Sequence, residues 1–449
     1  MSCGAQGALL QVQVQSNLDL WLTVNPECTF FQQDVCRHSP FAIAESDVAP
    51  SSTVRWGQIL QFEIPRAGDL LGALFLRLKV RGLRKGPAYP VGIPAIDDIV
   101  QWVNTVGYAG ISKATLEIGQ IIVDQKSGEL MELLEQYRSS PGNEQGAAIG
   151  TFDNANDLRE WSYNDQIMYV ALHFFMFEHP EMYLPIIALS AHAVRVKVYL
   201  NDKYALINAQ NGSGVPVDAS LANVLDATYN GDLVDAALTT RMVFLDQFER
   251  NLISAEVHEL VILQHQGDAS EAILAGTTTK AVTLSFNNAV LALITRWRAD
   301  SSTARSNFNT KDYFRYDVLR PAAQQAPFGG GTMRTVPFDE WQIKFNGTDR
   351  VCRRDSVYFT EVTPFLHAVK KAKGRAALLY SFHMAPFSDY HTPAGHAQFS
   401  RIHEVKSQAF FKTDGGGVSV LTETGTWDHL CLSYNVLRIA VGQALVKFS

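Results

Sequence analysis

Apolar and polar residues alternate in many short segments of this chain, and a two-residue period is typical of strands with one buried face. In the segment 74–81, three leucines and a valine alternate with Phe, Arg, Lys and Arg. The same alternation recurs at 60–64, 116–121, 194–200 and 282–286. Because Gly, Pro, Asn and Asp separate these segments, the pattern predicts antiparallel sandwiches and not βαβ units.

Helical periodicity is rare. The best candidate is 127–139, where four Leu and Met residues follow helical spacing, and a second candidate is 251–258. Three long segments rich in Gly, Ala, Gln or Pro, at 139–151, 208–220 and 321–337, are predicted to be loops. The chain is therefore predicted to be all-β with short helices and long loops, and long loops are accepted at the ends of a sandwich.

The length of 449 residues exceeds what one ordinary core needs. The strand-like segments on either side of 250–255 change character there, so we place a domain boundary in that region. The first clear strand is predicted at 29–35. These points predict an amino-terminal arm at 1–24, one sandwich at 25–250 and a second at 251–449, with no visible sequence repeat between the two.

Charged residues make up 18% of the chain, below the usual quarter, which favours a protein that hides surface in an assembly, although a large domain shows part of the same trend. The net charge of −7 disfavours direct nucleic-acid binding. Basic clusters at 79–85, 350–354 and 370–375 are interpreted as strand edges and loops.

No secretory signal or myristoylation site is expected at the start of the chain. The most apolar window, 182–200, contains His192, Arg195 and Lys197, so we predict no membrane span. The number of cysteines is odd and their spacing is unpaired, which predicts reduced thiols; they are Cys3, Cys28, Cys36, Cys352 and Cys431.

Catalytic motifs are missing from the sequence. It contains no Gly-Lys dipeptide and therefore no P-loop, and it contains no Gly-x-Ser-x-Gly elbow. The tightest polar cluster is Asp389, His391, His396 and His403, for which a turn-rich loop explains the composition as well as a metal site does. We therefore predict no catalytic residue, no cofactor and no metal. A cupin-like metal enzyme and a carbohydrate-binding sandwich stay open as alternatives.

Several segments carry a family resemblance in a consistent order along the chain. They include Asn25-Pro26 near the start, Leu116-Glu117-Ile118-Gly119-Gln120, Phe399-Ser400-Arg401-Ile402, and the closing Tyr434-Asn435-Val436-Leu437-Arg438-Ile439. Together they resemble the major capsid proteins of nucleocytoplasmic large DNA viruses. This resemblance implies two consecutive eight-stranded antiparallel jelly rolls and a structural, non-enzymatic role.

The resemblance also implies partners. Three chains would form a homotrimer, a pseudo-hexagonal capsomer that tiles an icosahedral shell with neighbouring capsomers, minor capsid proteins and penton proteins. Such a shell is part of the virion, is assembled in the host cytoplasm, and can lie near an internal viral membrane that its major protein does not span.

The amino-terminal arm is the candidate assembly site, because its broad apolar character cannot stay exposed at a free terminus. Its candidate residues are Leu9, Leu10, Val12, Val14, Leu18, Leu20, Trp21 and Leu22. The arm would dock against neighbouring capsomers or minor capsid proteins. The alternative is an additional edge strand within its own domain.

Overall fold

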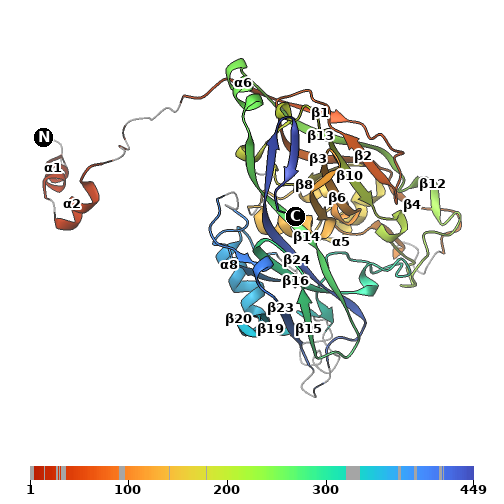
Figure 1. The fold of residues 1–449 in the computed structure, drawn as a ribbon. Helices are drawn as coiled ribbons and strands as arrows, with labels where there is room; N and C mark the ends of the chain where they lie inside the picture. Colours follow the sequence, from red (N-terminus) through yellow and green to blue (C-terminus); the bar gives the residue numbers. More distant parts are fainter. Residues whose placement is uncertain are drawn as a thin grey trace. The chain divides into compact units, whose positions relative to one another are not determined.

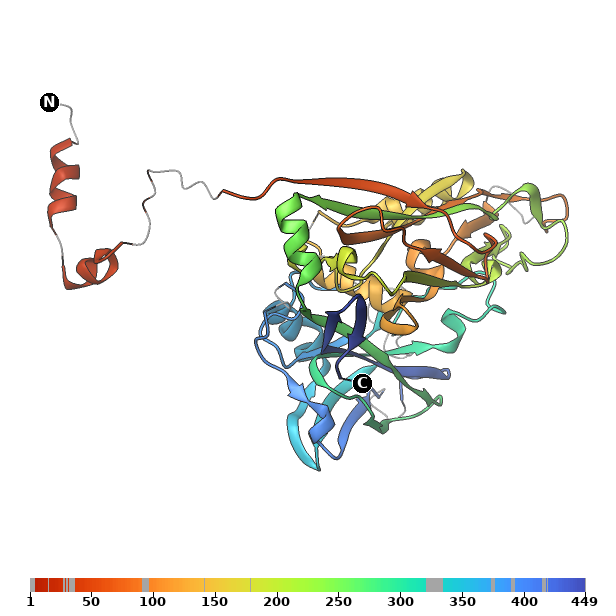
Figure 2. The ribbon, with the colours of Figure 1, turned by 45° about the horizontal axis from the view of Figure 1, so that its top comes forward.

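The computed structural model describes residues 5–14, 16–26, 29, 31, 37–90, 97–140, 142–177, 179–319, 334–372, 376–388, 392–413, 417 and 419–448. The chain divides into two compact units, Met1–Pro40 and Phe41–Ser449. All the sheets belong to the second unit, whose earlier and later segments form two neighbouring lobes (Figures 1 and 2).

The first lobe contains two antiparallel sheets. One has the strand order β1-β13-β3-β8, with β9 added beside β3, and the other has the order β2-β10-β6-β7. The bounds are β1 Phe41–Val48, β2 Ile59–Glu63, β3 Leu70–Val80, β6 Ile111–Ile118, β7 Ile121–Ser127, β8 Gln166–Leu172, β9 Leu184–Pro185, β10 Val194–Leu200 and β13 Leu233–Leu245. Consecutive strands mostly belong to opposite sheets, which is the connectivity of a jelly roll.

The second lobe repeats this topology with later strands. Its sheets have the orders β14-β24-β16-β21, with β22 and β25 added, and β15-β23-β19-β20. The bounds are β14 His258–Ile273, β15 Thr279–Leu284, β16 Ala289–Ala299, β19 Phe338–Phe345, β20 Thr348–Asp355, β21 Leu378–Ser381, β22 Ala397–Gln398, β23 Val405–Phe411, β24 Gly425–Ala440 and β25 Gln443–Val446. The prediction of two consecutive eight-stranded jelly rolls is confirmed, with short additional strands.

Alternation decides which side chains enter each core. Along β3, Leu74, Leu76 and Leu78 are buried while Lys79 is exposed, and β10 buries every second residue in the same way. The Leu116–Gln120 segment forms the β6–β7 hairpin, where Gly119 has a φ of 68° in a tight turn that favours glycine.

Short ladders and helices fill the connections. The ladders are β4 Leu83–Lys85 with β12 Leu225–Asn230, β5 Ile99–Trp102 with β11 Ile207–Gln210, and β17 Val318–Leu319 with β18 Arg334–Thr335. The helices of the second unit are α3 Val106–Ala109, α4 Gly128–Arg138, α5 Ala155–Tyr163, α6 Gln247–Ala255, the π-turn η8 Tyr358–Val362 and α8 Thr363–His367. Single 3₁₀ turns are η2 Gly146–Ile149, η3 Pro180–Met182, η4 Ile186–Ala188, η5 Lys203–Leu206, η6 Asp300–Ser302 and η9 Phe399–Arg401.

Several helices, loops and strands were predicted from the sequence, and some of them differ in the structure. The helix expected at 127–139 is α4, whereas the one expected at 251–258 begins earlier, as α6, and ends before β14. The loop expected at 139–151 contains the turn η2, and the one expected at 208–220 opens with the end of β11. Most of the strand expected at 29–35 and most of the loop at 321–337 lie outside the described residues. The first strand in the described part of the chain is β1.

Candidate assembly surfaces

The amino-terminal unit contains two helices, α1 Ala5–Gln13 and α2 Asn17–Thr23. Helix α2 begins with a capping box, in which the Ser16 hydroxyl accepts from the Asp19 amide and the Asp19 carboxylate accepts from the Ser16 amide. The Ser16 amide and the Ser16 hydroxyl both donate to the Asp19 carboxylate, and these two hydrogen bonds lower the pKa of Asp19 below its ordinary value. The alternative of an additional edge strand is therefore wrong for these two segments, which are helical.

The arm exposes all eight of its candidate residues. They are Leu9, Leu10, Val12, Val14, Leu18, Leu20, Trp21 and Leu22, and Trp21 has the largest exposed fraction, 78%. Asp19 is the one charged side chain in the sequence 1–26. The two helices therefore leave an exposed apolar surface that carries very little charge.

The two jelly rolls are joined chiefly by α4. This helix follows β7 of the first jelly roll, yet its Leu130, Leu133, Leu134 and Tyr137 pack in a buried cluster with the outer face of the sheet β14-β24-β16-β21 of the second. Tyr137 also stacks on Phe387, with 5.0 Å between ring centroids. The Ser127 side chain caps the start of the helix, and the first helical residue is glycine because a Cβ at Gly128 would lie 2.2 Å from the Tyr108 carbonyl oxygen.

A buried ion-pair network lies at the start of α4. Glu129 binds both Arg296 and Arg298 of β16, and Arg296 is only 1% exposed. Arg296 also pairs with Asp428 at 3.3 Å and donates to the Tyr316 hydroxyl at 2.8 Å. These residues were not among those predicted from the sequence. Two arginines at i and i+2 in an otherwise apolar strand were the available signal, because a buried guanidinium needs opposite charge.

Further polar pairs reinforce the same boundary. Lys126 of β7 pairs with Asp124 at 2.6 Å, beside His265 of β14, and burial raises the pKa of Asp124. On the other side of the boundary, Lys311 donates to the Ile207 carbonyl at 2.6 Å, and burial lowers its pKa to about 8. The two jelly rolls are thus fixed to each other at several separate places.

The closing segment of the chain also crosses the boundary. Leu437 and Ile439 at the end of β24, and Ala444 of β25, are buried in the core cluster of the first jelly roll. The Ala191 amide donates to the Gly442 carbonyl at 2.9 Å. The closing segment 434–439, which resembles the capsid family, therefore contributes to the contact between the two lobes.

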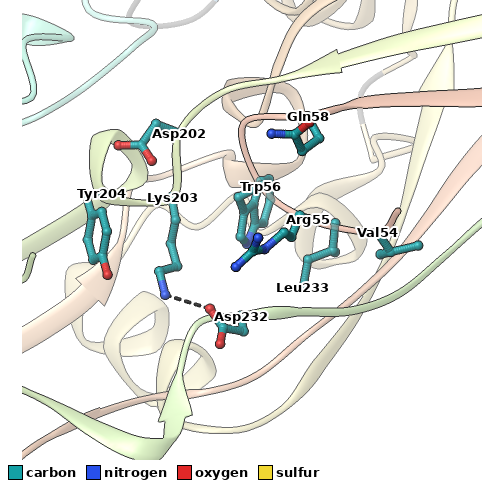
Figure 3. Close-up of a pocket in the computed structure, with 9 residues that line it drawn as sticks. All are labelled: Val54, Arg55, Trp56, Gln58, Asp202, Lys203, Tyr204, Asp232 and Leu233. Carbon is teal, nitrogen blue, oxygen red and sulfur yellow. Dashed lines mark hydrogen bonds and ion pairs between the residues drawn. The ribbon is translucent and has the colours of Figure 1, made fainter. Parts of the chain in front are cut away.

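A surface hollow of about 470 Å³ lies on the first jelly roll (Figure 3). Its walls include Arg55, Trp56 and Tyr204, and Lys203 pairs with Asp232 at 2.6 Å. The Trp56 indole nitrogen donates to the Gly231 carbonyl, and the Lys203 ammonium lies 4.9 Å from the Tyr204 ring centroid. Lys203, Asp232 and the Trp56 indole are thus engaged with the protein itself, and no specific observation favours a sugar site.

The metal alternative gains no support from the part of the chain that the structure describes. Asp389 and His391 lie outside it, while His396 and His403 are exposed. The described ranges hold no group of three or more His, Cys, Asp and Glu side chains arranged to bind a metal ion.

The basic clusters have local partners. Arg81 pairs with Asp165 at 2.7 Å, Arg353 pairs with Glu340, and Lys371 pairs with Glu361 at 2.5 Å, while residues 373–375 lie outside the described chain. Within the described ranges, no helix is both long and apolar enough to span a bilayer.

Two family models together match almost the whole chain. The model described as major capsid protein N-terminus matches residues 29–246, and the model described as large eukaryotic DNA virus major capsid protein matches residues 249–444. They meet between 246 and 249, at the start of α6.

Curated relatives and solved structures agree with these models. The major capsid proteins of Phaeocystis pouchetii virus and of Paramecium bursaria Chlorella virus 1 are 24% and 26% identical, each over 99% of both chains. A chain of the PBCV-1 virus capsid superposes with a TM-score of 0.72 at 22% identity, covering 94% of this chain and all of the other. The Faustovirus major capsid protein superposes with a TM-score of 0.71 at 11% identity, covering 96% of each chain.

Proposed function

Because this chain belongs to the major capsid proteins of large eukaryotic DNA viruses, we propose that it builds the virion shell as pseudo-hexagonal homotrimers. As a member of this family it is a structural protein of the capsid. The observation that carries the trimer proposal is the pair of jelly rolls with matching strand orders, joined by a buried boundary. Three such chains supply six similar lobes, which can close into one ring.

The boundary between the lobes supports this proposal physically. A hexagonal tile needs a fixed angle between neighbouring lobes, and α4, the Glu129 network and the closing segment all hold that angle within one chain. A flexible boundary would leave the angle undefined. We propose residues 25–250 and 251–449 as the two domains, with the boundary at α6.

We further propose that the arm, residues 1–24, connects the capsomer to other shell components. Its exposed apolar helices and near absence of charge support a protein partner, since anionic lipid surfaces attract basic segments. Neighbouring capsomers, minor capsid proteins and penton proteins are the candidate partners, in a shell that can lie near an internal membrane.

Mass measurement tests the trimer. The chain has a mass of 49.7 kDa, so light scattering should give about 150 kDa, and negative-stain images should show a triangular particle on a hexagonal base. A monomer whose mass does not change with concentration would reject the proposal.

We also propose that this chain catalyses no reaction, which its membership in a family of structural proteins supports. Elemental analysis and a glycan array on the purified protein are the tests. Stoichiometric metal would favour a cupin-like activity, and selective glycan retention would favour a carbohydrate-binding role.

A further inference from the structure

The two jelly rolls carry helices at equivalent places in their topology. In the first jelly roll, β7 is the edge strand of its sheet, and the chain passes from β7 through α4 towards β8, the edge strand of the opposite sheet. In the second jelly roll, the chain passes in the same way from β20 through η8 and α8 to β21. The segment η8–α8 is continuous helix from 356 to 367. Helix α4 packs against the next jelly roll along the chain, whereas the segment η8–α8 belongs to the last one.

Their amino-terminal caps align the first turns of the two helices. The Ser127 hydroxyl accepts from the Leu130 amide at 3.2 Å, and the Asp355 carboxylate accepts from the Tyr358 amide at 3.0 Å, three residues on in both cases. Four residues after each cap, Met131 and Phe359 are buried in the core of their own jelly roll.

The next turn of each helix confirms the alignment. Eight residues after the cap, Glu135 pairs with His173, directly after β8, and Thr363 donates to the Leu379 carbonyl of β21 at 2.6 Å. Each helix therefore presents the same face to its own jelly roll. The opposite faces should then be equivalent as well.

Those opposite faces differ in what covers them. Seven and ten residues after its cap, α4 carries Leu134 and Tyr137, which are buried against the second jelly roll. Seven and ten residues after its cap, the other helix carries Val362 and Phe365. Both side chains are exposed, and the exposed fraction of Phe365 is 76%. Leu366 beside them is exposed too, so this helix has an apolar face equivalent to the docking face of α4.

The surface that receives α4 also has a counterpart. Helix α4 lies against Ile294 and Arg296 of β16, the strand that pairs with β24. In the first jelly roll, the equivalent strand is β3, which pairs with β13. Its segment Ala73–Lys79 aligns with Ala292–Arg298 of β16, so that Phe75 corresponds to Ile294 and Arg77 corresponds to Arg296. On this outer face, Ile167 and Tyr169 of the adjacent β8 are exposed.

We propose that helix η8–α8 of one copy docks on the outer face of the sheet β1-β13-β3-β8 of a second copy, as α4 docks within the chain. Phe365, the counterpart of Tyr137, lies over the part of this face where Ile167 and Tyr169 are exposed. The inference rests on the proposed trimer and names its interface. Each chain has one helix and one receiving sheet that are not used within the chain. In a ring of three copies, contacts within a chain therefore alternate with contacts between chains, and every helix and every receiving sheet has a partner.

The charges at the two contacts fit this assignment. Arg296 obtains its carboxylates from Asp428 and from Glu129 of the docked helix, whereas Arg77 is already paired with Asp235 at 3.0 Å and Asp47 at 3.5 Å within its own sheet. At the position of Glu129, two residues after the cap, the second helix has Val357. The helix therefore brings no carboxylate to Arg77, whose partners lie in its own sheet, and the intermolecular contact is expected to weaken little with added salt.

The test replaces an exposed phenylalanine at the proposed contact and another one elsewhere. Phe365→Glu places a charge in the contact, and Phe248→Glu on α6 is the control, because Phe248 is 78% exposed and Phe365 is 76% exposed. We expect F365E to raise the dissociation constant of the trimer by about 30-fold or more, as the loss of an interface hot spot does, and F248E to leave it unchanged. Under conditions in which all three proteins are monomeric, both variants should have the same Tm as the wild type.

A photo-crosslinking residue at position 365 identifies the receiving surface directly. The expected products join position 365 of one chain to peptides from 70–80 or 166–172 of another. If the wild-type protein is a trimer and F365E dissociates no more readily than F248E, or if the crosslinks fall on a different surface, the helix contact is rejected while the trimer stands. A monomeric wild-type protein would instead reject the proposed trimer itself.

Discussion

The carboxylate of Glu129 binds the guanidinium of Arg296 across the boundary between the two jelly rolls. The two residues belong to different lobes, and Arg296 is almost completely buried. An ion pair in this setting adds less to stability than its geometry suggests, because both charges lose hydration. The ion pair instead fixes the position of α4, since the two arginines have all their partners only when α4 lies in one place.

Replacing Glu129 with Gln should destabilise the protein. The substitution removes the carboxylate that Arg296 and Arg298 share and leaves Asp428 as the remaining acidic partner of the buried Arg296, and removing one partner of a buried ion pair costs about 3 kcal/mol. Urea unfolding measures the loss. The control is Glu45→Gln, which removes an exposed partner of Arg241 at 3.8 Å and should cost less than about 1 kcal/mol. Equal losses in the two variants would show that the Glu129 network does not fix the boundary.

The stability should fall between pH 7 and pH 5 because of His429. Burial lowers the pKa of this histidine to about 4. Its Nε2 is hydrogen-bonded to the Ser407 hydroxyl at 2.8 Å. The folded protein keeps the ring neutral while the unfolded chain takes up a proton near pH 6.5, so the unfolded state binds more protons throughout the window between pH 6.5 and pH 4.

The expected loss from His429 is about 2 kcal/mol between pH 7 and pH 5, and it levels off below pH 4. Urea titrations at several pH values check it against His429→Gln, whose stability should change less over the same range. An identical slope in the variant would assign the pH dependence to other groups.

Thermal unfolding should give the same Tm with and without a reductant. Cys352 and Cys431 are free thiols, and burial raises the pKa of Cys431 well above its ordinary value, which suppresses its thiolate. Cys3, Cys28 and Cys36 lie outside the described residues. A fall of several degrees in the reduced sample would reveal a structural disulfide, since losing one costs about 2 to 5 kcal/mol.

Deleting residues 1–24 should leave the folded trimer intact and reduce its incorporation into shells. Among the described residues of the arm, none belongs to the core cluster of either jelly roll, and Leu9, Leu10, Trp21 and Leu22 are exposed. Trp21→Ala, the smallest matched change, should reduce incorporation in the same direction. The measurements are Tm, trimer mass and recovery in assembled particles. Loss of the trimer on deletion would mean that the arm serves folding.

The sequence determined the parts of the fold that depend on neighbouring residues. Alternation along 74–81 and 194–200 predicted strands and their buried faces, because side chains of a strand point to opposite sides in turn. Leucines at helical spacing predicted α4, and the resemblance of the ordered motifs predicted the pair of jelly rolls. The arm residues were found as an apolar segment, but their helices were not predicted.

Only the tertiary structure decided what these elements contact. The sequence of α4 shows an apolar face without showing that it covers the other jelly roll, and nothing local distinguishes Arg296, paired by a distant helix, from Arg77, paired within its own sheet. Nor could the sequence show that Tyr137 is buried while Phe365, at the same place in the second helix, is exposed. Periodicity depends on positions a few residues apart, whereas burial and ion pairing depend on segments that folding brings together from more than a hundred residues away.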